Sequence, residues 1–196
     1  MIAAIPGIVL AAGASRRMGR SKALLPLGAS GLPFARVVCD TLRAAGVSPI
    51  VVVTRAELRD SLEALLPATA LVVNPDPDRG QLSTLLTGLE ALDAPVAALM
   101  TLVDLPLVRV TTVEALLASW YQTHAPLVRP VCRGRHGHPV IFGAPLLDAL
   151  RSADIGAGAK PVVQRFLADS VTVAVDDPAT IDDIDTPEEY ERLGRL

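Results

Sequence analysis

Apolar runs of four to eight residues alternate along the first half of the chain with segments that have helical periodicity. The runs are rich in Val, Ile, Leu and Ala and predict buried strands at residues 5–10, 50–53, 70–73 and 95–102. The intervening segments predict helices at residues 34–45, 57–66 and 83–92. Regular alternation of strand and helix is typical of right-handed βαβ units, so this half of the chain predicts a parallel sheet.

The second half is less regular. Thr111 and Glu114 have capping-box spacing and predict the start of a helix that ends near residue 121. Thr186, Pro187 and Glu189 give the same signal for a last helix that ends near residue 193. Between them we expect strands at 127–132, 140–142 and 171–175, helices at 145–153 and 161–167, and loops at 134–139 and 154–160. The pattern predicts one α/β domain over residues 1–196, with a Rossmann-like three-layer α/β/α arrangement and a mixed, mostly parallel sheet.

Composition narrows the class of protein. Hydrophobic residues make up 51% of the 196 residues but aromatic residues only 3%, which suits parallel strands covered by helices. A formal net charge of −3 argues against a general nucleic-acid surface. No apolar run approaches the ~20 residues that span a bilayer, and the charges near the N-terminus follow the apolar run, unlike a signal peptide. We therefore expect a cytoplasmic protein, with Cys39 and Cys132 as reduced, buried thiols.

Residues 10–22, LAAGASRRMGRSK, concentrate positive charge directly after the first strand. Positions 1–39 contain no Asp or Glu. A glycine-containing loop with Arg and Lys after a strand indicates phosphate binding, although neither P-loop nor GxGxxG spacing is present. The chain has only two lysines, Lys22 and Lys160, and both stand in or beside glycine loops. The alternative is an ordinary turn with exposed arginines, and that remains our expectation for Arg17 and Arg20.

The candidate metal ligands are carboxylates far apart in the sequence. Asp104 follows the apolar strand 95–102, and a phosphate-bound Mg²⁺ takes one or two such ligands. Asp185, which precedes the predicted helix cap, is the preferred partner, and Asp183 is the alternative. A turn cap for Asp104 and solvated charge for most acids of residues 169–191 are the competing interpretations. Because loops 11–22, 74–81 and 103–106 follow strands of one parallel sheet, we expect them to face one crevice.

The histidines do not indicate a zinc site, and no motif indicates a covalent nucleophile. His136 and His138 are too few for a zinc site, and the neighbouring glycines leave either a structural or a substrate-contacting role open. The sequence contains no GxSxG elbow. These features favour phosphoryl chemistry by positioning and electrostatics, without a covalent enzyme intermediate.

These motifs together resemble the MobA/MocA-like nucleotidyltransferases, which have the nucleotide-diphospho-sugar transferase fold. Residues 10–22 resemble the family signature LxxGxxxRMGxxK, and Asp104-Leu105-Pro106 resembles its DxP metal motif. Four further segments match in family order and extend the resemblance over nearly the whole chain: NPDPDRGQLSTL, GHPVIF, DIGAGAKPVV and DIDTPEEY. The chain departs from the family at Val103 and Leu105, where Gly and Gln are frequent, and at Ile155 and Lys160.

The resemblance implies roles for individual residues. The catalytic residues would be Arg16, Lys22 and Asp104, and Asp104 and Asp185 would hold Mg²⁺. The nucleotide would contact Leu10, Ala11, Ala12, Gly13, Arg16, Lys22, Asn74, Gly80 and Ser83. The acceptor would contact Gly137, His138 and Lys160.

The resemblance also implies a reaction. A nucleotide monophosphate would move from an NTP to the phosphate of molybdenum cofactor (molybdopterin), with release of pyrophosphate and a molybdenum hydroxylase as a recipient of the product. LAAG, where the guanylyl-transferring branch has LAGG, favours CTP. The alternatives are a sugar-phosphate or other small-phosphate nucleotidyltransferase, and a non-catalytic carrier of the cofactor.

Overall fold

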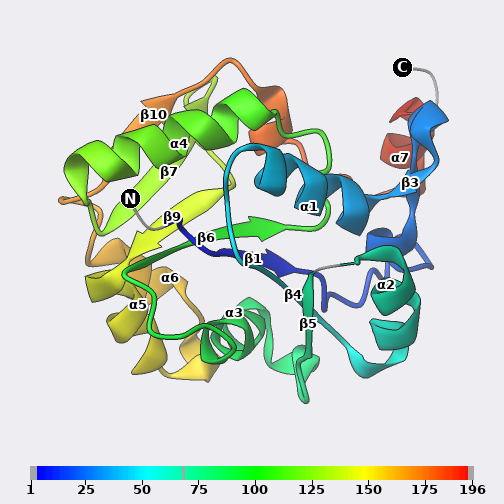
Figure 1. Cartoon of the computed structure of the whole chain (residues 1–196), viewed down its shortest axis with the longest axis horizontal. Helices are drawn as coiled ribbons and strands as arrows, with labels where there is room; N and C mark the ends of the chain where they lie inside the picture. The colour runs from blue at the N-terminus through cyan, green and yellow to red at the C-terminus, as the bar shows by residue number, and fades with distance from the viewer. Residues whose placement is uncertain (1–3, 68, 194–196) are drawn as a thin grey trace.

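The central sheet contains seven strands in the order β10-β7-β9-β6-β1-β4-β5, and β8 pairs with β7 outside this order (Figure 1). The computed structural model describes residues 4–67 and 69–193. The seven strands are β1 Gly7–Leu10, β4 Ile50–Thr54, β5 Ala70–Val73, β6 Ala97–Leu102, β7 Leu127–Cys132, β9 Val140–Gly143 and β10 Val171–Ala174. Their positions agree with the predicted strands to within two residues at either end.

Strand direction confirms a mixed, mostly parallel sheet. β1 pairs in parallel with β4 and β6, β4 with β5, and β7 with β10. β9 runs antiparallel to both β6 and β7. The short strand β8, Arg135–His136, extends the sheet as an antiparallel hairpin on β7. The β8 hairpin and the short ribbon β2 Pro26–Leu27 with β3 Leu32–Pro33 were not predicted from the sequence.

Helices cover both faces of the sheet, because successive strand residues point to opposite sides. On β1, Val9 belongs to one apolar cluster and Ile8 to the other. In Figure 1, α1 Phe34–Ala44 and α4 Val110–Thr123 lie above the sheet, and α3 Gln81–Glu90, α5 Ala144–Arg151 and α6 Lys160–Gln164 lie below it. The remaining helices are α2 Arg59–Leu65 and α7 Pro187–Leu193. None of the helices within residues 4–67 and 69–193 is long and apolar enough to cross a membrane.

The start of α4 differs from the sequence prediction. The helix begins at Val110 and not after a capping box at Thr111. Its N-terminus is capped from far along the chain: the Arg109 backbone N–H donates to the Asp177 carboxylate at 2.9 Å, and the Thr112 hydroxyl donates to the same oxygen at 2.7 Å. Asp177 is 2% exposed, so this member of the acidic C-terminal segment is a buried structural group and not solvated charge.

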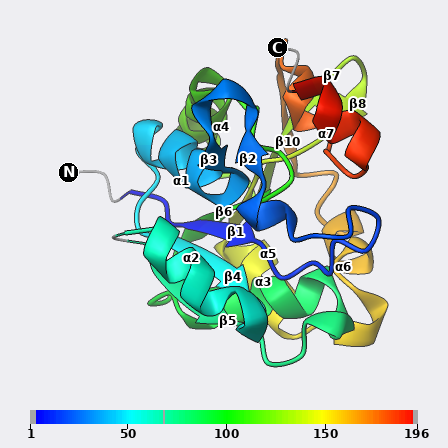
Figure 2. The same cartoon turned by 90° about the vertical axis from the view of Figure 1, so that its right-hand side faces the viewer.

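The C-terminal helix α7 contacts the short β2–β3 ribbon that follows the loop after β1. The Thr186 hydroxyl accepts the Glu189 N–H at 3.3 Å, and the Glu189 carboxylate accepts the Thr186 N–H at 2.8 Å, so the capping box predicted for α7 is present. The Tyr190 hydroxyl donates to the carbonyl of Pro26 at 2.7 Å. As Figure 2 shows, the blue loop after β1 therefore lies between α7 and the helices below the sheet.

Candidate active site

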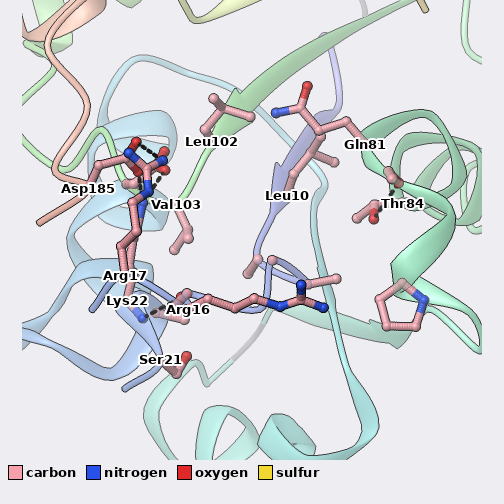
Figure 3. A pocket seen from close by; sticks show the side chains of 18 residues that line it. Leu10, Arg16, Arg17, Ser21, Lys22, Gln81, Thr84, Leu102, Val103 and Asp185 are labelled. Atoms are coloured by element: carbon pink, nitrogen blue, oxygen red, sulfur yellow. Dashed lines mark hydrogen bonds and ion pairs between the residues drawn. The ribbon is translucent and has the colours of Figure 1, made fainter. Parts of the chain in front are cut away.

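The candidate site lies at the carboxyl ends of β1 and β6, where the strand order reverses: β4 and β5 lie on one side of β1, and β6 on the other. Crevices at such switch points are the usual ligand sites of open α/β sheets. A cavity of about 330 Å³ opens here (Figure 3). Its lining includes seven residues predicted for the nucleotide, namely Leu10, Ala11, Ala12, Gly13, Arg16, Lys22 and Gly80, together with Asp104 and Asp185.

The loop after β1 is folded on itself. The Ser15 carbonyl accepts the Met18 N–H at 3.0 Å, the Ser15 hydroxyl accepts the Lys22 N–H at 3.2 Å, and the buried Met18 side chain anchors the loop to the core. Gly13 is different: a Cβ at this position would meet nothing within 4 Å. Packing therefore does not require the glycine, whereas close approach of a ligand to the backbone would. Arg16 extends along the cavity toward the side of α3 (Figure 3).

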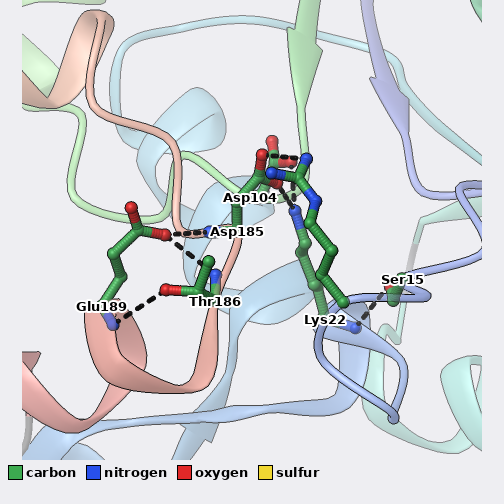
Figure 4. A network of polar contacts seen from close by, with 7 residues as sticks. Ser15, Lys22, Asp104, Asp185, Thr186 and Glu189 are labelled. Atoms are coloured by element: carbon green, nitrogen blue, oxygen red, sulfur yellow. Dashed lines mark hydrogen bonds and ion pairs between the residues drawn. The ribbon is translucent and has the colours of Figure 1, made fainter.

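A cluster of cations and carboxylates forms one wall of the cavity (Figure 4). The Lys22 ammonium donates to Asp104 Oδ2 at 2.9 Å and also to Asp185 Oδ1. Arg17 forms an ion pair with the second oxygen of Asp185. The Asp185 backbone N–H donates to the Glu189 carboxylate at 2.8 Å, so the capping box of α7 also fixes the segment that carries Asp185. Lys22 is 9% exposed, and its partners hold the charge in place.

The cluster favours the ionised forms of Lys22 and Asp185. Burial alone would lower the pKa of Lys22, but the hydrogen bonds to Asp185 and Asp104 outweigh burial and raise it above the usual value. Burial would raise the pKa of Asp185, but the hydrogen bond from Lys22 outweighs burial and lowers it. Burial, with repulsion from Asp185 and Asp104, raises the pKa of Asp183. At neutral pH the wall therefore carries a protonated lysine against an ionised Asp185.

The carboxylates in this wall fit a divalent cation. One oxygen from each of Asp104, Asp183 and Asp185 lies within 4.8 Å of the others. Asp104 Oδ1 is shielded from solvent and has no hydrogen-bond partner among the described residues. Clustered carboxylate oxygens are the donors that Mg²⁺ prefers. The cluster contains both Asp183 and Asp185, the two residues that the sequence offered as the second metal ligand.

Two residues predicted to contact the nucleotide lie behind the cavity. The buried Asn74 side chain donates to the hydroxyls of Ser83 at 3.2 Å and Thr84 at 3.1 Å. Asn74 Oδ1 accepts the Asp76 N–H at 3.0 Å. Asn74 and Ser83 therefore hold loop 74–81 against α3 and do not line the cavity, which differs from the direct contact expected of them. Thr84, on the same helix, does line it.

A second, larger cavity of about 580 Å³ adjoins the first, and Gln81 and Leu102 line both. Gly137, His138 and Lys160, the three residues predicted for the acceptor, all line it. His138 donates its backbone N–H to the Thr180 carbonyl at 2.9 Å, and burial lowers the pKa of its imidazole to about 4, so the ring is neutral at pH 7.

Sequence reasoning missed several contacts. Arg17 is exposed as expected, but it also pairs with Asp185. Arg20 is exposed as expected too, but its guanidinium lies 5.1 Å from the centre of the Tyr190 ring. Both contacts cross more than 165 positions in the sequence, so no local pattern could reveal them. Gln81 and Arg129 were also missed as cavity residues. Both cysteines are buried as predicted, and burial raises the pKa of Cys39 to about 12.

The fold and the site define a class: an α/β protein whose main cavity, lined by basic residues and carboxylates, lies where strand order reverses. Residues 7–173 match the family model described as the MobA-like NTP transferase domain, and the chain belongs to this nucleotidyltransferase family.

Three relatives illustrate the family. Nicotine blue oxidoreductase of Paenarthrobacter nicotinovorans is 33% identical over 96% of both chains. A "Probable molybdenum cofactor guanylyltransferase" of Natronomonas pharaonis is 27% identical over 95% of both. The solved structure of Rv0371c from Mycobacterium tuberculosis H37Rv is 26% identical, with a TM-score of 0.83 over the full length of each chain.

Proposed function

We propose that the protein transfers CMP from CTP to the phosphate of molybdopterin and releases pyrophosphate. The observation that carries the proposal is the wall formed by Lys22, Asp104 and Asp185 at the carboxyl ends of β1 and β6. In this wall a lysine that suits phosphate binding lies beside carboxylates that suit a metal ion. A non-catalytic carrier of the cofactor would need neither the lysine nor the metal site.

The reaction needs no general base from the protein. A phosphate monoester is mostly dianionic at pH 7, since its second pKa is about 6. One of its oxygens attacks the α-phosphorus of CTP, a new P–O bond forms, and the bond to the bridging oxygen of the β-phosphate breaks. Pyrophosphate leaves with the electron pair of that bond. The protein's task is therefore to hold two anions in line and to offset their charge.

Two cations of the loop after β1 perform that task. Lys22, fixed between Asp104 and Asp185, offers a rigid ammonium to the triphosphate, and Arg16 reaches along the cavity from the same loop. Asp104 and Asp185, with Asp183 beside them, are the residues that would hold Mg²⁺. When bound, such a cation neutralises phosphate oxygens and lowers the repulsion between acceptor and nucleotide.

The acceptor belongs in the second cavity. It adjoins the nucleotide cavity through Gln81 and Leu102, so an acceptor phosphate at the junction would face the α-phosphate. A molybdenum hydroxylase would then receive the product in the cytoplasm. The choice of base rests on LAAG at residues 10–13, while the relative from Natronomonas pharaonis is named for guanylyl transfer. Parallel assays with CTP and GTP decide this point.

The variant Asp104→Asn tests the chemistry. We expect a folded protein whose pyrophosphate release falls about 10²–10³-fold, the usual loss when a charge-stabilising group is removed from an active site. Asp182→Asn is the matched control, because Asp182 is an exposed acid adjacent in sequence to Asp183 of the carboxylate cluster and lines neither cavity. Undiminished Mg²⁺-dependent release from the Asp104→Asn protein would refute the assignment.

Two alternatives receive their own assays. A relative 33% identical over 96% of both chains is named an oxidoreductase, so oxidation of NADH and NADPH is followed in the same preparation. Sugar-1-phosphates and alditol phosphates replace molybdopterin in a second series. Pyrophosphate release with those acceptors alone would move the proposal to the sugar-phosphate class.

A further inference from the structure

One arginine in the second cavity has no partner. Arg129 lies in the middle of β7, on the same face of the sheet as Leu127, and it lines the second cavity, which is also lined by residues of α6. Its Nε is shielded from solvent and makes no hydrogen bond. Within residues 4–67 and 69–193, no carboxylate forms an ion pair with it. A guanidinium is always charged, so this position brings a permanent positive charge into a largely aliphatic cavity.

Arg129 as a whole is half-buried, but its surroundings make the shielded, unpaired Nε costly. The floor of the cavity is formed by Met100, Leu127, Val140 and Phe142, which are apolar and buried. A shielded, unsatisfied donor costs about 1–3 kcal/mol, and more when the group is charged. Packing of the arginine stem against the sheet would be served equally well by a methionine or a leucine. The charge itself therefore calls for a ligand.

The acidic and basic residues of the second cavity lie at different places in it. Its one acidic lining residue is Asp183, which belongs to the carboxylate cluster at the nucleotide end. Arg129 is on β7, and β9 separates that strand from β6, which leads to Asp104. With neighbouring strands about 4.8 Å apart, Arg129 is roughly 10 Å across the sheet from β6. Lys160 adds a second cation, from the start of α6.

We propose that Arg129 determines acceptor specificity by binding an anionic oxygen at the end of the acceptor that is remote from the transferred nucleotide. The acceptor is then a molecule with two oxygen-bearing ends. One end, the phosphate, faces Lys22 and Asp104. The other end is a carboxylate or an ionised ring oxygen, separated from the phosphate by a flat, mostly apolar body that fills the aliphatic part of the cavity. Identifying this molecule as the acceptor rests on the proposed function, whereas the charge preference of the cavity does not.

A binding experiment without nucleotide tests the charge preference. The probes are 2-naphthoate and its neutral amide, 2-naphthamide, titrated into the full-length protein and followed by NMR. We expect the wild type to bind the carboxylate at least about tenfold more tightly, which corresponds to about 1.4 kcal/mol. Arg129→Gln abolishes the difference, and Arg129→Lys retains part of it. Arg165→Gln, at an exposed arginine of the α6 segment outside this cavity, leaves the preference unchanged.

Two results would overturn the proposal: equal binding of both probes by the wild type, or an unchanged carboxylate preference in Arg129→Gln. Should Arg129→Gln fail to fold, Arg129→Lys and the wild type still decide the question. In the transfer assay, Arg129→Gln should raise the KM for the acceptor about tenfold or more and leave the KM for CTP unchanged, whereas a merely structural role would alter both. Absence of pyrophosphate release from the wild type would refute the proposed function without touching the charge preference.

Discussion

Replacement of Lys22 by methionine removes the charge that pairs with Asp104 and Asp185, beside which Asp183 lies. Methionine keeps an unbranched apolar stem of similar length, so packing of the stem changes little. Oxygens of Asp104, Asp183 and Asp185 then lie within 4.8 Å of one another with no ammonium between them. Two unit charges at that distance repel by about 3.5 kcal/mol at an effective dielectric constant of about 20. Side-chain movement relieves part of this, so we expect the free energy of unfolding to fall by about 2–4 kcal/mol in metal-free buffer.

The same variant should respond more strongly to a divalent cation. In the wild type the Lys22 ammonium already offsets part of the negative charge of the carboxylates, so millimolar Mg²⁺ without nucleotide adds less stability there than in the variant. In Lys22→Met the cation replaces the missing charge, and binding to the folded state alone raises its stability. Urea unfolding with EDTA and with MgCl₂ measures both effects. Lys160→Met is the matched control, because Lys160 is the only other lysine and is exposed.

The expected pattern is a loss of stability in EDTA that Mg²⁺ largely reverses, confined to Lys22→Met. The reasoning is refuted if Lys22→Met is as stable as the wild type in EDTA, or if Mg²⁺ stabilises both proteins equally. The first result would mean that the carboxylates do not share the lysine in solution. The second would mean that the response to Mg²⁺ does not depend on the charge of Lys22.

Three further predictions concern residues that stabilise the fold around the site. Burial lowers the pKa of His138 to about 4 from an ordinary 6.5, so its contribution to stability is complete above pH 6.5 and is lost as the pH falls toward 4, by up to about 1.4 kcal/mol per unit. Unfolding titrations should show a flatter acid slope in His138→Gln than in the exposed control His136→Gln; equal slopes would contradict this. Asp177→Ala removes the distant cap of α4 and should cost about 2–4 kcal/mol in urea unfolding, and a loss below about 1 kcal/mol would contradict the capping role. In Gly137→Ala the new Cβ would lie 1.9 Å from the Thr180 carbonyl oxygen, so the melting temperature should fall with a loss of about 1–3 kcal/mol, and an unchanged melting temperature would contradict this packing.

The sequence predicted the sheet well because its strands are apolar runs that pack on both faces. Residues 50–53 and 95–102 have no other stable environment than a buried sheet, and alternation with helices set their direction. The capping box at Thr186 is a local pattern and was equally visible. The antiparallel insertion of β9 was not visible, because strand direction there depends on pairing with β6 and β7 over long sequence separations.

For the site, the motifs indicated most of the functional residues but not the contacts between them. The pairing of Lys22 with Asp104 and Asp185 crosses 82 and 163 positions, and the sequence offered only residue types and loop order for it. Asn74 was expected at the nucleotide, yet its amide is satisfied by Ser83 and Thr84 behind the cavity. Arg129 belongs to no motif, and only its shielded, unpartnered Nε distinguishes it from a surface arginine.

One incubation tests the central claim most directly. The protein is mixed with Mg²⁺, CTP and molybdopterin, pyrophosphate is quantified, and the product is identified by mass. The account predicts one pyrophosphate for each molecule of molybdopterin cytosine dinucleotide, with the formation of both products about 10²–10³-fold slower in Asp104→Asn. Molybdopterin that stays unmodified while CTP remains intact, with or without NADH oxidation in the parallel assay, would contradict it.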